Sequence, residues 1–173
     1  MVYNSDLHHR KSIRLNGYDY SSNGMYHVTI CTQDKQELFG KIIDGKMVLN
    51  HAGKMIEKIW YEIPQYYNGI EIDIFQIMPD HFHGIIIIDN IENGQPQGVA
   101  PTISLFDVVH RFKTMTTKLY SDSVKNGTYS PYNKRVWQRN YYEEIIKNDK
   151  ALYEIREYII NNPMLLMGSE VFN

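Results

Sequence analysis

The chain has 173 residues, a length that suits one compact domain with a sizeable core. Its 43% hydrophobic and 22% charged residues are ordinary for a globular protein and argue against disorder over most of the chain. The single cysteine, Cys31, excludes an internal disulfide framework and a cysteine-cluster zinc site, and a net charge of -2 is not that of a general nucleic-acid coating protein. The longest apolar run, residues 85–88, is too short to cross a bilayer, so we expect a cytoplasmic protein.

Hydrophobic periodicity divides the chain into a polar, basic arm over residues 1–16 and a single domain over residues 17–173. Runs with alternating or β-branched character predict strands over residues 26–31, 39–43, 46–49, 70–76 and 81–88. Apolar residues at helical spacing predict helices over residues 51–63, 104–120, 142–147 and 150–161. A polar stretch over residues 89–102 predicts a loop, and residues 121–132 a linker.

Capping and turn residues support these boundaries. Asp44-Gly45 between two apolar runs is a strong hairpin signal, Asn50 and Ser104 are plausible helix caps, and Pro163 is expected to end the last helix. Strands interrupted by two long helices, without regular strand-helix repetition, predict an α+β fold whose antiparallel sheet has helices on one face and leaves the other free for chemistry.

A pair of histidines lies on one predicted strand. Residues two apart on a strand share a face, so His81 and His83 point the same way while Phe82 points to the other layer. Two neighbouring imidazoles can bind a divalent metal, although His-x-His alone is a weak signal, and most such pairs are surface or hydrogen-bonded histidines. Gly84 removes a side chain beside the pair, which we expect to leave room for a ligand.

The last predicted helix carries Tyr158 and Asn162 four residues apart, on the face opposite its apolar residues. A tyrosine hydroxyl can attack a phosphodiester if a cation stabilises the charged phosphate, and His81, His83 and the amide oxygen of Asn162 could hold that cation. With 14 tyrosines in the chain, a packing or surface role is the default for any one of them. The residues alone do not distinguish Tyr158 from Tyr141 or Tyr142.

Residues 109–147 carry eight basic side chains against three acidic ones and are a candidate phosphate-facing surface. A solvated face without a ligand explains the charge equally well. The basic residues are Arg111, Lys113, Lys118, Lys125, Lys134, Arg135, Arg139 and Lys147.

Five motifs, which together cover nearly the whole chain in order, resemble those of a known family. They are Arg10-Lys11-Ser12-Ile13-Arg14 followed by Gly17-Tyr18-Asp19-Tyr20, Val28-Thr29-Ile30-Cys31-Thr32, Met78-Pro79-Asp80-His81-Phe82-His83-Gly84, Val136-Trp137-Gln138-Arg139-Asn140-Tyr141-Tyr142, and Glu157-Tyr158-Ile159-Ile160-Asn161-Asn162-Pro163. With them the sequence resembles the single-tyrosine transposases of the HUH nuclease class, and most of all the branch associated with repetitive extragenic palindromes (REP).

This resemblance implies a ferredoxin-like fold and an enzyme that recognises a DNA hairpin, cleaves single-stranded DNA nearby and keeps the 5′ end on a tyrosine. It implies Tyr158 as nucleophile, with Tyr142 as the alternative, and Mg2+ or Mn2+ held by His81, His83 and Asn162. The DNA contacts that we expect are Arg10, Lys11, Arg14, Arg111, Lys113 and Arg139. The sequence leaves open whether the protein is a monomer or a homodimer.

Two other functions compete with this interpretation. A protein that binds hairpin DNA or RNA without cutting it would need exposed aromatic and basic side chains but neither the histidine pair nor Tyr158. A metal hydrolase would need further histidine and aspartate ligands on later strands, and most of the remaining histidines precede residue 52.

Overall fold

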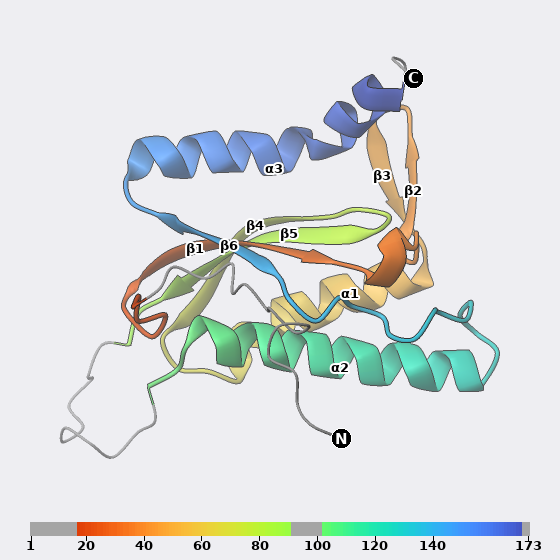
Figure 1. Cartoon of the computed structure of the whole chain (residues 1–173), viewed down its shortest axis with the longest axis horizontal. Coiled ribbons are helices and arrows are strands. Elements are labelled where there is room, and N and C mark those ends of the chain that lie inside the picture. Colours follow the sequence, from red (N-terminus) through yellow and green to blue (C-terminus); the bar gives the residue numbers. More distant parts are fainter. Residues whose placement is uncertain (1–16, 91–101, 171–173) are drawn as a thin grey trace, which may run out of the picture.

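The computed structural model describes residues 17–90 and 102–170, with side chains described as far as residue 165, and Figure 1 shows their arrangement. The strands are β1 (Gly24–Cys31), β2 (Gly40–Ile43), β3 (Lys46–Leu49), β4 (Ile70–Ile77), β5 (His81–Ile88) and β6 (Tyr142–Ile146). The helices are α1 (His51–Glu62), α2 (Leu105–Lys125) and α3 (Asp149–Glu170), with short 3-10 turns η2 (Gln33–Lys35) and η3 (Ile63–Gln65). No helix of the described residues is long and apolar enough to span a membrane.

Four strands form an antiparallel sheet in the order β4-β5-β1-β6, and β2 pairs with β3 in a separate hairpin. Leaving the hairpin aside, the elements follow each other as strand, helix, two strands, helix, strand, which is the ferredoxin-like arrangement that the resemblance implied. In Figure 1, α1 and α2 lie below the sheet and α3 lies above it. Two helices therefore cover one face as predicted, and the third lies over the face expected to be open.

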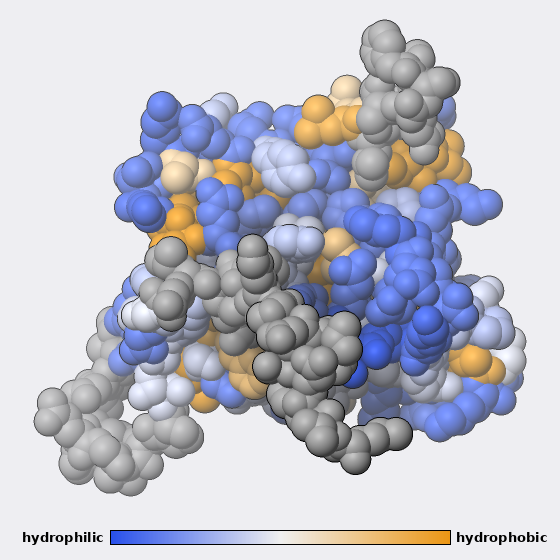
Figure 2. Space-filling model, in the orientation of Figure 1, coloured by the Kyte–Doolittle hydropathy of each residue, from blue (hydrophilic) through white to orange (hydrophobic). Residues whose placement is uncertain are grey.

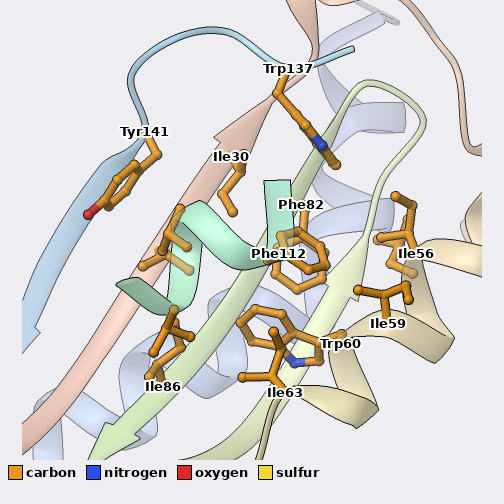
Figure 3. Packing of buried hydrophobic residues seen from close by; sticks show 14 of the residues in the cluster. Ile30, Ile56, Ile59, Trp60, Ile63, Phe82, Ile86, Phe112, Trp137 and Tyr141 are labelled. Carbon is orange, nitrogen blue, oxygen red and sulfur yellow. The ribbon is translucent and has the colours of Figure 1, made fainter. Parts of the chain in front are cut away.

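The main core lies between the sheet and the α1–α2 layer. Tyr26, Val28 and Ile30 of β1 are fully buried there, as the alternation of that strand predicted. Figure 3 shows Trp60 of α1 packed against Phe82 of β5, and their ring centroids lie 4.6 Å apart. Burial of large side chains such as these contributes about 2 to 3 kcal/mol each, so this face carries most of the stability.

Local signals place the ends of the elements. The side chain of Asn50 accepts a hydrogen bond from Gly53 N at 2.9 Å, and Ser104 and Asp107 form a reciprocal capping box at the start of α2. Asp44 and Gly45 have left-handed φ angles of 51° and 71°, as the tight turn between β2 and β3 requires. The predicted loop over residues 89–102 lies largely outside the described residues, and so does the arm over residues 1–16.

One predicted element type and two predicted helix ends were wrong. Residues 142–146 form the edge strand β6 rather than a helix, because they complete the free side of β1, where tertiary pairing outweighs the helix preference of two glutamates. Helix α2 continues to Lys125, well into the predicted linker. Pro163 lies inside α3 instead of ending it, and Figure 1 shows a bend in the C-terminal part of that helix, as expected where a proline removes one backbone hydrogen bond.

Candidate active site

The predicted histidine pair lies on the face of the sheet that α3 covers. His81 and His83 on β5 are buried, and Phe82 between them points to the opposite face and belongs to the main core. On the next strand, His27 and Thr29 alternate with the core residues and so share the face of the histidine pair. This face therefore gathers three histidines from two neighbouring strands.

Each ring nitrogen of His81 has a partner. Its Nδ1 lies 2.5 Å from Asp80 Oδ1, and its Nε2 lies 3.3 Å from Asn162 Oδ1 on α3. Burial raises the pKa of Asp80, but the hydrogen bond and charge of His81 and the charge of Lys35 outweigh it and hold that pKa below its usual value. Since an ionised carboxylate only accepts, His81 donates from Nδ1, and in the neutral tautomer that keeps this hydrogen bond the lone pair lies on Nε2.

The imidazole of His83 is held through its Nδ1 atom. Its Nδ1 lies 2.9 Å from Thr29 Oγ1 and 3.2 Å from His27 Nε2, whereas its Nε2 is buried and has no hydrogen-bond partner. Burial, with smaller effects of nearby charges, lowers the pKa of His83 to about 3, and burial lowers the pKa of His27 to about 4. Both rings are neutral at pH 7, the state in which imidazole binds metal.

Helix α3 brings Tyr158 and Asn162 onto the histidines. The ring centroid of Tyr158 lies 5.3 Å from that of His83 and 6.2 Å from that of His27, in edge-on geometry. Asn162 is buried, one helical turn further on, while Tyr158 remains 45% exposed and so accessible to a large substrate. The structure thus brings together Tyr158, Asn162, His81 and His83, as predicted.

These side chains fit a divalent metal. The chemistry of the set, two imidazole nitrogens and an amide oxygen, suits such an ion, and the unpartnered Nε2 of His83 is a buried polar atom that needs a partner. His81 Nε2 and Asn162 Oδ1 lie 3.3 Å apart, so two of these donor atoms are neighbours. Within the described ranges, no three histidine, cysteine, aspartate or glutamate side chains are grouped to hold a metal, so the fit depends on the amide.

The alternative tyrosines are placed differently. Tyr142 pairs with Thr29 across β6 and β1, so it shares the face of the histidines, and it is 58% exposed. Tyr141 is buried in the main core. Tyr142 therefore stays the alternative nucleophile, and the ring contacts to two histidines favour Tyr158.

Comparison with known proteins shows the family of the chain. Residues 20–162, most of the chain, match the family described as IS200-like transposases. The chain belongs to this family. The resemblance to single-tyrosine transposases is thereby confirmed, and the protein is a transposase, an enzyme class that acts on DNA.

Three relatives illustrate the match. An uncharacterized protein of Haemophilus influenzae is 43% identical over 183 residues, covering 98% of this chain and 97% of its own. A REP-associated tyrosine transposase bound to a REP hairpin has a TM-score of 0.56 at 17% identity, covering 87% of this chain and 73% of the other. A Deinococcus radiodurans protein described as a transposase candidate has a TM-score of 0.50 at 18% identity, covering 86% and 95%. The last two likenesses show the fold.

Three of the predicted DNA contacts of the transposase lie in the described part of the chain. Arg111 and Lys113 lie on α2, across the sheet from the histidines; the Arg111 guanidinium lies 3.4 Å from the ring centroid of Tyr66. The Lys113 ammonium donates to Gln138 O at 2.7 Å and Arg139 O at 2.8 Å, and burial lowers the pKa of Lys113 to about 8. Arg139 is exposed. These three stay predicted DNA contacts, and Arg10, Lys11 and Arg14 lie outside the described residues.

Gly84 of the transposase serves the core and not the site. A Cβ atom at this position would lie 2.6 Å from the Trp60 ring and 2.8 Å from the Phe82 ring, on the α1 side of the sheet. The expectation that Gly84 makes room for a ligand was wrong, because even-numbered residues of this part of β5 face the core.

Three residues around the histidine pair, His27, Thr29 and Asp80, were not predicted from the sequence as parts of the site. His27 and Thr29 alternate with the predicted core residues of β1, so their shared face was readable, but their position beside His83 depends on strand order. Asp80 directly precedes His81, and only the tight turn between β4 and β5 shows that its carboxylate meets the imidazole.

Proposed function

We propose that this transposase cleaves and rejoins single-stranded DNA near a hairpin, with Tyr158 as nucleophile and a divalent metal, Mg2+ or Mn2+, held by His81, His83 and Asn162. One observation carries the proposal: the accessible Tyr158 and the buried Asn162 of α3 lie against His81 and His83. The Nδ1 atoms of both histidines already have partners. The related transposase whose structure contains a REP hairpin supports a hairpin substrate.

The chemistry needs few groups. The Tyr158 hydroxyl loses its proton and its oxygen bonds to the phosphorus, while the bond from phosphorus to the 3′ oxygen breaks and that oxygen takes up a proton to become a 3′ hydroxyl. The 5′ end stays on the protein. A bound divalent cation would stabilise the charge on the phosphate oxygens. Because the phosphotyrosine link conserves the bond energy, attack by a 3′ hydroxyl rejoins the DNA by the reverse step.

Asp80 and Thr29 act on the histidines rather than on the DNA. Asp80 fixes the His81 tautomer through Nδ1, and Thr29 bonds Nδ1 of His83, so both Nε2 atoms are left for the cation. The half-exposed position of Tyr158 on a helix surface lets an extruded DNA strand approach from the solvent.

The test uses labelled single-stranded hairpin DNA from the flanks of the transposase gene, incubated with protein and Mn2+ and resolved on a denaturing gel. We expect a covalent protein-DNA band with the wild type and with Tyr153→Phe, an exposed tyrosine of the same helix, but none with Tyr158→Phe or after chelation of the metal. A band lost in Tyr142→Phe and kept in Tyr158→Phe would move the nucleophile to Tyr142. Binding without any covalent band would instead indicate a hairpin-binding protein that does not cut.

A further inference from the structure

Backbone strain gathers in two turns at one end of the sheet. Four non-glycine residues in the described part of the chain have positive φ angles, and one of them, Asp44, belongs to the hairpin turn between β2 and β3. The other three are Asp34 (55°) and Lys35 (54°) in η2, and Lys134 (56°) in the segment that precedes β6. A lysine is unfavourable in this left-handed region, where glycine or asparagine is tolerated.

The two turns are tied to each other. Gln33 N donates to Val136 O at 2.9 Å, and Asn133 N donates to the side-chain oxygen of Gln36, also at 2.9 Å. Thr32 Oγ1 bonds Gln36 O and Asp80 O, both at 2.9 Å, which fixes η2 to the turn before His81. Strained residues persist where the surroundings over-determine them in this way, and they cluster at functional sites.

Lys35 projects from this strained turn to the end of β5 that carries the proposed metal ligands His81 and His83. Its ammonium lies 3.5 Å from Asp80 Oδ2 and 3.7 Å from Cys31 Sγ, and Asp80 in turn bonds His81. The distance to Asp80 is long for an ion pair with a charged donor, and 59% of the lysine side chain is exposed. Lys35 thus places a positive charge beside the histidines, where it pairs with Asp80 and remains accessible to solvent.

Further basic side chains follow along the second turn. Lys134 and Arg139 are exposed and Arg135 is half-buried, while the carboxylate of the nearby Asp34 accepts a hydrogen bond from the side-chain amide of Gln33 at 2.6 Å. In Figure 1, η2 is the short orange-red turn at the right-hand end of the sheet, and Figure 2 shows that the surface around it is mainly hydrophilic.

We propose that these interlocked turns form a phosphate clamp for single-stranded DNA, in which Lys35 contacts the phosphate beside the bond that is cut and Lys134 a phosphate further along. The inference rests on the proposed function, since it needs a DNA strand at Tyr158. A glycine at position 35 or 134 would adopt this conformation without strain. The charge of the lysine side chain therefore explains why a lysine stands at each position. Phosphate contacts by lysine position a strand without reading its sequence.

The test measures binding of a fluorescein-labelled single-stranded hairpin oligonucleotide by anisotropy, in the Tyr158→Phe background with chelator and at several NaCl concentrations. Lys35→Asn should weaken binding about 3-fold to 10-fold and reduce the slope of log affinity against log salt by about 0.7, the share of one single-strand phosphate contact. Lys35→Arg should keep most of the affinity. Lys58→Asn, an exposed lysine on α1 that pairs with Glu62, is the matched control and should change neither quantity.

Thermal unfolding separates this role from a structural one. Because asparagine tolerates the left-handed conformation, Lys35→Asn should raise the melting temperature by about 1 to 3 °C while it weakens DNA binding. An unchanged salt slope in Lys35→Asn, with lower Mn2+ affinity measured by electron paramagnetic resonance, would show that Lys35 only supports Asp80 and would overturn the clamp. If the Tyr158→Phe protein bound no DNA, both proposals would be contradicted. If the Lys35 variants changed binding as expected but the wild type formed no covalent band, only the proposed reaction would be contradicted.

Discussion

In the proposed metal site, the Nε2 atoms of His81 and His83 are the ones left for a ligand, because the Nδ1 atom of each ring already has a partner. Asp80 occupies Nδ1 of His81, and Thr29 and His27 occupy Nδ1 of His83. Partners of this kind fix the tautomer and the ring orientation of metal-binding histidines. A change in these supporting residues should therefore reduce metal affinity even though none of them would touch the metal.

Burial of His27 and His83 makes the metal-free fold sensitive to acid. Their pKa values, lowered to about 4 and about 3, lie below the 6.5 of an unfolded chain, so the unfolded state binds more protons as the pH falls below about 6.5. Stability should be full above that pH and should fall by about 1 to 2 kcal/mol per histidine between pH 7 and pH 5.

Urea unfolding in chelator at the two pH values measures this loss. His27→Gln keeps a hydrogen-bonding side chain but removes one titrating ring, so its loss between pH 7 and pH 5 should be smaller than that of the wild type by about 1 to 2 kcal/mol. Equal losses in the two proteins would mean that His27 does not titrate differently in the folded and unfolded states.

At the scale of elements, a bulge in β4 forms part of the surface on which α3, the helix that carries Tyr158, packs. The register shifts between Ile72 and Phe75, which both pack on the main core, while Asp73 and Ile74 between them meet α3. Ile74 packs on the small cluster around Ile155 and Ile159. β-Bulges, in which two successive residues can face the same neighbouring layer, are common beside active sites.

An ion pair between Asp73 of β4 and Arg156 of α3 also holds the helix to the sheet. Arg156 lies two residues before Tyr158. Asp73 Oδ2 lies 2.6 Å from one terminal nitrogen of Arg156 and 2.8 Å from its Nε, and the carboxylate is only 17% exposed. Arg156→Met should leave this carboxylate unpaired, lower the free energy of unfolding by about 1 to 3 kcal/mol and slow formation of the covalent band more than 10-fold at saturating DNA.

Single-turnover cleavage and urea unfolding check that expectation. Lys150→Met removes the exposed pair with Glu154 on the same helix and should change stability by less than about 0.5 kcal/mol and leave the rate unchanged. If Arg156→Met cleaved as fast as Lys150→Met, the ion pair would have no part in positioning Tyr158.

At the scale of the whole molecule, the sheet separates a stabilising face from a chemical one. One face carries the main core with α1 and α2, and the other carries the histidines beneath α3, which is anchored by a much smaller apolar cluster. A rigid sheet behind the histidines would keep the proposed ligand set in place, and the lightly anchored helix brings Tyr158, the proposed nucleophile, to it.

Sequence periodicity was sufficient for the parts of the fold that are fixed locally. The alternation of β1, the hairpin at Asp44 and the caps at Asn50 and Ser104 follow from neighbouring residues. Residues 142–146 could not be predicted in this way, because only the free edge of β1 makes them a strand. For the same reason the pattern of α3 showed its apolar stripe but not the sheet face that it covers.

The candidate site was predictable where its residues lie close together in the sequence. His81 and His83 share a strand and Tyr158 and Asn162 share a helix, but their meeting came from the family resemblance and not from spacing. His27 and Lys35 belong to the site through strand order and through a strained turn, and neither property has a clear signal in one sequence.

The most direct test of the account is to identify the tyrosine that carries the DNA. The covalent complex, trapped with a hairpin oligonucleotide and Mn2+, is digested with nuclease and trypsin and analysed by mass spectrometry. Tyr158 lies in the C-terminal tryptic peptide that begins at Glu157, whereas Tyr141 and Tyr142 lie together in the peptide from Asn140 to Lys147. The account predicts a nucleotide phosphate on Tyr158 in the first peptide; a modification confined to the second peptide would contradict it.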